Sequence, residues 1–156
     1  MSRSLKRVMA ALGAAGVEAE LREFAEGTRT AHDAADAVGC ALDQIAKSIL
    51  FRGENSGSAI LFVTAGGNQV CADRAAVLAG EPLGKADARL IRAQTGFAIG
   101  GVSPIGHLTP PRAYWDPRLL DFAEIWAAAG TPRHVFGIAP ELLLRLSGAD
   151  AADFTA

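Results

Sequence analysis

Ala46-Lys-Ser-Ile-Leu-Phe51 and Ala59-Ile-Leu-Phe-Val-Thr-Ala65 are two short, nearly continuous apolar runs, and they decide the fold. Each run predicts a strand, and the lack of polar alternation is typical of a central strand that is covered on both faces. The intervening stretch 52–58 holds Gly53, Asn55, Ser56 and Gly57, which predicts a loose hairpin loop. The centre of the sheet is therefore expected to be this hairpin.

Helices and strands are mixed on both sides of the hairpin. Helices are expected near 5–12, 31–38, 74–79, 86–94 and 139–146, with a short helical turn at 42–44. Further strands are expected at 17–24, 69–72, 114–115, 125–129 and 134–138, the last two as a closing hairpin. Helix 31–38 has clear ends, because Thr30 can cap it and Gly39 can stop it. Without a strict βαβ rhythm, this order predicts an α+β domain with a mixed, largely antiparallel sheet.

Composition predicts a single domain over residues 1–156 with a core made mostly of Ala, Val, Leu and Ile, since 50% of the residues are hydrophobic but only 6% are aromatic. The apolar runs are too short to span a bilayer, so no membrane contact is expected.

Cys40 and Cys71 are isolated, which favours reduced thiols and a cytoplasmic protein. A net charge of −2 argues against coating nucleic acid by bulk charge, and a short single-stranded end is easier to accommodate than a duplex.

Several common catalytic sites are excluded by their missing motifs. The chain has no GxSxG, HExxH or P-loop motif, and Ser103 has the wrong spacing for a nucleophile elbow. Pro104 also removes a backbone donor that such an elbow uses. His32, His107 and His134 are far apart and have no paired ligand spacing. Neither a metal nor another cofactor is therefore expected.

Lys47 is a charged residue at the start of a central apolar strand. A lysine in this position needs a partner or a shifted pKa if it lies in the core. Taken alone, it is more simply explained by an ammonium that points to solvent at the edge of the strand. The functional alternative is an ammonium at the floor of a pocket, where it binds an anionic or carbonyl group.

The stretch 96–111 is rich in glycine and proline, and Gly100, Gly101 and Gly106 lie in it. Glycines let a ligand approach the backbone closely and expose N–H groups that can hold a phosphate or polarise an ester carbonyl. An ordinary surface loop explains the same glycines when nothing else is considered.

Three segments taken in order resemble the YbaK/EbsC family, also called the prolyl-tRNA synthetase-associated editing domain. They are the Ala-rich helix at 30–39, Gln44-Ile-Ala-Lys-Ser-Ile-Leu-Phe51 and Thr95-Gly-Phe-Ala-Ile-Gly-Gly-Val-Ser-Pro-Ile-Gly106. The resemblance extends from Leu5 to about Leu146 and implies a sheet with barrel-like curvature, flanked by helices. It implies a free-standing hydrolase that cleaves the ester between a wrong amino acid and tRNA, commonly the tRNA for proline.

The resemblance also implies roles for individual residues. The family's essential lysine falls on Lys47, and the adjacent hydroxyl that contacts substrate falls on Ser48. Its glycine-rich loop falls on Gly100, Gly101, Ser103, Pro104 and Gly106. Backbone N–H groups of Gly100 and Gly101 would stabilise an oxyanion, while Lys47 would anchor a phosphate or the terminal ribose, or act electrostatically on the ester, rather than serve as a general base. Further substrate contacts are expected from Thr30, His32, His107 and Ala128.

Two departures from the family pattern bear on specificity. Ala128 stands where some relatives carry a serine, and no aspartate lies between Arg133 and Ile138, which argues against the cysteinyl-tRNA deacylase subgroup. The partner implied is aminoacyl-tRNA through its 3′ acceptor end, with prolyl-tRNA synthetase as a further candidate. Two alternatives stay open: a non-catalytic module that binds aminoacyl-tRNA ends or a synthetase, and a hydrolase of another small ester or nucleotide conjugate.

Overall fold

The central hairpin consists of β2 (Ile45–Gly53) and β3 (Ala59–Ala65) in the computed structural model, which describes residues 2–156. The two strands pair antiparallel from Ala46–Ala65 to Arg52–Ala59, and the Gly53 N–H donates to the Ser58 carbonyl at 2.9 Å. Every residue of β3 is buried, so the expectation of a strand covered on both faces is confirmed.

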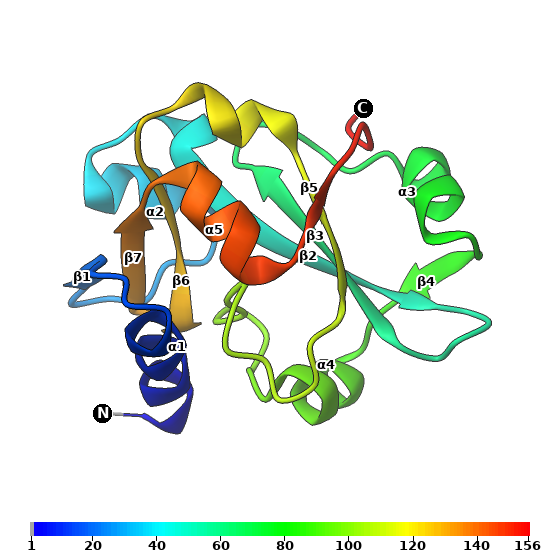
Figure 1. Cartoon of the computed structure of the whole chain (residues 1–156), viewed down its shortest axis with the longest axis horizontal. Coiled ribbons are helices and arrows are strands. Elements are labelled where there is room, and N and C mark those ends of the chain that lie inside the picture. The colour runs from blue at the N-terminus through cyan, green and yellow to red at the C-terminus, as the bar shows by residue number, and fades with distance from the viewer. Residues whose placement is uncertain (1) are drawn as a thin grey trace.

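Six further strands complete one mixed sheet of eight strands (Figure 1). They are β1 (Glu20–Glu23), β4 (Leu83–Lys85), β5 (Arg112–Trp115), β6 (Ile125–Thr131), β7 (His134–Ile138) and β8 (Asp150–Ala151). The order is β1-β7-β6-β2-β3-β5-β8, and β4 pairs with β2. The β1–β7, β2–β3, β2–β4 and β6–β7 pairs are antiparallel, and the other three are parallel. The predicted mixed, largely antiparallel sheet is therefore confirmed.

Helices cover both faces of the hairpin. They are α1 (Arg3–Ala14), α2 (Ala31–Val38), α3 (Ala72–Ala79), α4 (Ala88–Thr95) and α5 (Pro140–Ser147), with short 3₁₀ turns η1 (Leu42–Gln44) and η2 (Pro117–Asp121). Because side chains alternate along a strand, Leu61 of β3 joins the core cluster of α1 and α5, while Phe62 joins the cluster of α3. The ends of α2 are as predicted: the Thr30 hydroxyl accepts from the Asp33 N–H at 3.1 Å, and Gly39 is left-handed.

The sheet is split beside β2. Strands β2 and β6 share only the pairs Ile45–Trp126 and Ala46–Ala127. From Phe51 onward, the same edge of β2 pairs with β4. In Figure 1, β6 and β7 run at a steep angle to β2 and β3. Residues 47–50 of β2 consequently have a partner strand on the β3 side only.

The structure differs from expectation at short elements. The strand predicted at 69–72 is wrong: only an isolated bridge joins Val70 to Thr155, and α3 begins at Ala72. Strands β4 and β8 and the turn η2 were not predicted, because two to five residues are too few to display a period. No helix within residues 2–156 has both the length and the apolar character needed to cross a membrane.

Candidate active site

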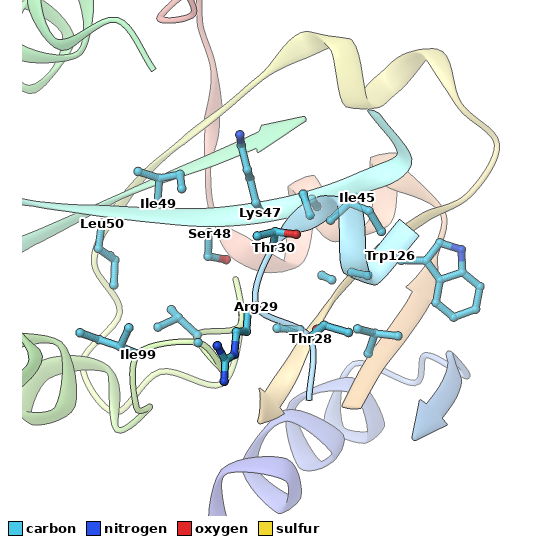
Figure 2. Close-up of a pocket in the computed structure, with 18 of the residues that line it drawn as sticks. Thr28, Arg29, Thr30, Ile45, Lys47, Ser48, Ile49, Leu50, Ile99 and Trp126 are labelled. Carbon is cyan, nitrogen blue, oxygen red and sulfur yellow. The ribbon is translucent and has the colours of Figure 1, made fainter. Parts of the chain in front are cut away.

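A cavity of about 360 Å³ lies where β2 separates from β6 (Figure 2). Its walls come from the 28–31 segment and α2, from β2, from the loop after α4, and from β6 and β7. Five residues predicted from the sequence line it: Thr30, Lys47, Ser48, Gly100 and Ala128. The split in the sheet therefore brings together residues that are up to about a hundred positions apart.

Strand β2 presents two different faces at the cavity. Figure 2 shows Lys47 and Ile49 pointing to one side of the strand and Ser48 and Leu50 to the other, as the alternation of a strand requires. The Lys47 ammonium donates to the Gly66 carbonyl at 3.2 Å. Lys47 thus borders the cavity, while its charged end is held by the turn that follows β3.

The electrostatics around Lys47 involve two carboxylates. Burial lowers the pKa of Lys47 from its ordinary value, and the charges of Asp43 and Asp116 oppose this shift. Asp116 is buried and accepts hydrogen bonds from the Ala65 N–H at 3.1 Å and from the Asn68 amide at 2.9 Å. With its ammonium already engaged by a carbonyl, Lys47 is suited to electrostatic action rather than to proton abstraction.

Ser48 carries an unpartnered hydroxyl. Its Oγ is buried and has no hydrogen-bond partner among the residues that the structure describes. An unmade hydrogen bond of a buried hydroxyl costs about 1–3 kcal/mol. Since Ser48 lines the cavity, a ligand there can supply the missing partner.

Gly100 and Gly101 occupy different environments. Gly100 is exposed, lines the cavity and has a φ of 93°, which a residue with a side chain adopts at a cost. Gly101 packs against the end of β6, and a Cβ there would lie 2.8 Å from the Thr131 Cα. Its N–H donates to the Ala98 carbonyl at 3.1 Å and is not free to bind an oxyanion.

The second half of the glycine-rich loop lies behind the cavity. Ser103 and Pro104 are buried, and Gly106 lies against α1, where a Cβ would meet the Arg7 carbonyl oxygen at 3.3 Å. The Nε2 of His107 contacts the Ser103 carbonyl at 2.5 Å, and burial lowers the pKa of this histidine. These residues support the loop from behind and do not line the cavity.

His32 also lies apart from the cavity lining. It is exposed on α2, whereas Ala31 and Ala34 are the residues of this helix that face the cavity. Thr30, just before the helix, lines the cavity as predicted, although its hydroxyl is engaged in capping α2.

Arg29 and Ile99 line the mouth of the cavity and were not singled out from the sequence. Both are exposed, and Figure 2 shows Arg29 extending toward the loop that carries Ile99. Within the described part of the chain, the Arg29 guanidinium forms no ion pair. The sequence does contain one signal for Arg29: it directly precedes the helix cap Thr30, and a residue next to a cap lies at the N-terminus of a helix.

The side chains of the cavity can bind and polarise a ligand. Ser48, the hydroxyl nearest Lys47 in the chain, has no base bonded to it, so a serine–histidine relay is not formed. Residues 2–156 contain no group of three His, Cys, Asp or Glu side chains placed to hold a metal ion. The site offers charge, a free hydroxyl and apolar walls. These groups suit a substrate whose bond is already reactive and needs no protein nucleophile.

The model of the family described as "Aminoacyl-tRNA editing domain" matches residues 25–146. The chain belongs to this aminoacyl-tRNA editing domain family, so the YbaK-type resemblance seen in the sequence is confirmed.

Three similar proteins extend this comparison. The uncharacterized protein YwhH of Bacillus subtilis (strain 168) is 32% identical over 130 residues, covering 83% of this chain and 82% of that protein. A crystallised protein described as a proposed trans-editing enzyme for prolyl tRNA synthetase is 46% identical, with a TM-score of 0.92 over 100% of this chain and 99% of that one. The hypothetical protein APE2540 is 25% identical, with a TM-score of 0.87 over 96% and 99% of the two chains.

Proposed function

We propose that this protein is a trans-acting deacylase that hydrolyses the ester between a small, wrong amino acid and the 3′ end of the tRNA for proline. The observation that carries the proposal is the cavity beside β2, which places Lys47, Ser48 and Gly100 around one space in an aminoacyl-tRNA editing domain. The similar structure described as acting for prolyl tRNA synthetase supports the choice of tRNA.

The lining of the cavity supports a small amino acid. Ala31 and Ala34 of α2 and Ala127 and Ala128 of β6 all line the space, and the remaining wall is largely aliphatic. A cavity lined this way accepts a short apolar side chain and leaves a long polar side chain against aliphatic walls.

Lys47 and Ser48 contribute in different ways. The Lys47 ammonium points to the other side of β2 and is held by the Gly66 carbonyl, so its positive charge would favour the negative charge that develops on the ester from across the strand rather than by contact. Ser48 offers its free hydroxyl to the substrate. A strong protein nucleophile is not required, because an aminoacyl ester is already activated and water can attack it.

Arg29 and Ile99 suit the end of the tRNA at the mouth of the cavity. A guanidinium binds phosphate in a bidentate manner, and an exposed aliphatic side chain can pack against a base. The protein carries a net charge of −2, so a few local contacts of this kind, rather than a broad basic surface, would hold the 3′ end.

The deciding experiment measures deacylation of the tRNA for proline charged in turn with Ala, Ser, Thr, Cys and 2-aminobutyrate. We expect release of at least one small amino acid by the wild-type protein and loss of that release in Lys47→Ala. Lys6→Ala, an exposed change on α1, is the matched control and should keep full activity. Full activity in a folded Lys47→Ala protein would contradict the role assigned to this lysine.

The same assay separates the deacylase from the two alternatives. Binding to charged tRNA without turnover of any of the five substrates would indicate a non-catalytic module. Equal hydrolysis of a minimal aminoacyl-adenosine ester and of charged tRNA would instead indicate a hydrolase of small esters.

A further inference from the structure

The edge of β2 that faces the cavity is open between two neighbouring strands. Pairing with β6 ends at Ala46, and pairing with β4 begins at Phe51. All four residues of the gap, 47–50, line the cavity. A four-residue length of strand edge, about 13 Å long, therefore borders the cavity without a partner strand.

The hydrogen-bond pattern of the hairpin identifies the backbone groups that face this gap. The Gly53 N–H donates to the Ser58 carbonyl of the hairpin. In an antiparallel pair, only every second residue directs its N–H and C=O to the partner strand. Counting back from Gly53, Phe51 and Ile49 face β3, so Ser48 and Leu50 direct their backbone groups to the opposite edge. No bond to the Ser48 N–H, the Ser48 carbonyl or the Leu50 N–H appears outside the strand ladders of residues 2–156.

We infer that Ser48 binds the α-aminoacyl group of the substrate through its backbone, as if that group were one residue of an added antiparallel strand. The α-amine donates to the Ser48 carbonyl, and the ester carbonyl accepts from the Ser48 N–H. This inference rests on the proposed function and names the feature of the substrate that the site recognises.

The chemistry of the gap matches an aminoacyl ester. A hydrogen-bonded pair of antiparallel residues exchanges one N–H···O bond in each direction, and an aminoacyl group carries an N–H donor and a carbonyl acceptor on either side of one α-carbon. Strands β6 and β4 flank the gap and limit the occupant to about one or two residues. Every amino acid shares these backbone atoms, so this pairing selects the class of substrate while the cavity walls select its size.

The pairing also supplies a donor in place of the Gly101 N–H. The Gly101 N–H is bound to the Ala98 carbonyl, whereas the Ser48 N–H lies at the open edge. Water adds to the carbonyl carbon, and the oxyanion so formed keeps its bond to the Ser48 N–H. The bond from that carbon to the ribose oxygen then breaks, and a proton from the water ends on the ribose oxygen.

Hydrogen exchange of individual amide protons tests the inference without turnover. The probe is 3′-alanylamino-3′-deoxyadenosine, in which a stable amide replaces the ester. In the free protein, we expect fast exchange at Ser48 and Leu50 and slow exchange at Ile49; saturating probe should slow Ser48 roughly tenfold or more, as expected when one hydrogen bond forms. Slow exchange at Ser48 in the free protein, absence of probe binding, or binding without protection of Ser48 would each overturn the inference.

Two matched comparisons assign the protection to backbone pairing. The propionyl analogue lacks only the α-amine and should bind roughly tenfold more weakly. Replacing Ser48 by the corresponding α-hydroxy acid removes its N–H and should weaken binding of the alanyl probe by a similar factor. The control is the same replacement at Phe51, which removes an N–H that faces β3 and should leave the affinity for the probe unchanged. The pairing would be refuted if the alanyl and propionyl analogues bound equally well, or if the ester variant at Ser48 bound the alanyl probe as tightly as the wild type. If this variant deacylated charged tRNA at the wild-type rate, the pairing would be refuted but the proposed function would remain intact.

Discussion

Replacing Gly101 by alanine tests whether the double glycine acts through packing rather than through a free N–H. The added Cβ would lie 2.8 Å from the Thr131 Cα, 2.9 Å from the Gly130 carbonyl oxygen and 3.0 Å from the Thr131 nitrogen. All three are backbone atoms at the end of β6, so the loop that carries Gly101 must move by several tenths of an ångström. Overpacking of this kind costs about 1–3 kcal/mol, which for a chain of this size corresponds to a fall in Tm of roughly 4–8 °C at the middle of that range.

Thermal unfolding and deacylation assays measure the two consequences of this change. Gly101→Ala should lower the Tm and also lower kcat/KM at a temperature where the variant is folded, because Gly100 and Ile99 at the cavity mouth move with the loop. Gly13→Ala is the control: it lies in α1, has open space around it, and should raise stability by about 0.5–1 kcal/mol without changing activity. A Gly101→Ala protein with the Tm and kcat/KM of the wild type would refute the packing argument.

Three further predictions concern charged groups. Lys47→Met should fold and lose on the order of 100-fold in kcat, as for other electrostatic groups; a loss below tenfold would contradict its role. Arg29→Ala should raise KM for charged tRNA and reduce the salt dependence of binding by about one phosphate contact, leaving kcat unchanged; unchanged salt dependence would exclude a phosphate contact. Because burial lowers the pKa of His107, the unfolded chain binds a proton first as pH falls below about 6.5, and stability decreases until the folded-state pKa is reached. His107→Gln should flatten this decrease in Tm between about pH 7 and pH 5, and an unaltered slope would refute the assignment.

The long apolar runs and the capped helix made the core of the fold predictable. β2, β3 and α2 have the expected type because runs of six and seven mostly apolar residues and a Thr30–Gly39 pair of helix ends are strong local signals. Pairing partners could not be predicted in the same way. The neighbours of β2 include β6, about eighty residues later, and no local pattern in either strand specifies that contact.

The predicted site residues that lie at the cavity are those that share one strand or one turn with a clear motif, and their roles in catalysis and binding stay predictions. Lys47, Ser48, Gly100, Thr30 and Ala128 all line the cavity. The direction of each group could not be predicted, because it depends on strand pairing: the Lys47 ammonium reaches Gly66, and the Gly101 N–H turns back to Ala98. The only local signal for Arg29 is its place before the helix cap Thr30, which is weak because many exposed arginines stand next to helix ends.

The long sequence separation of the cavity walls has a consequence for biosynthesis. The space is bounded by residues from Thr28 to Val135, and β2 meets β6 only after the intervening chain has been made. Contacts between distant segments form slowly, since a long loop must close before they are gained. A nascent chain that has released only the central hairpin from the ribosome therefore has no enclosed cavity. The cavity is completed in a late step, when the 125–138 hairpin docks against β2.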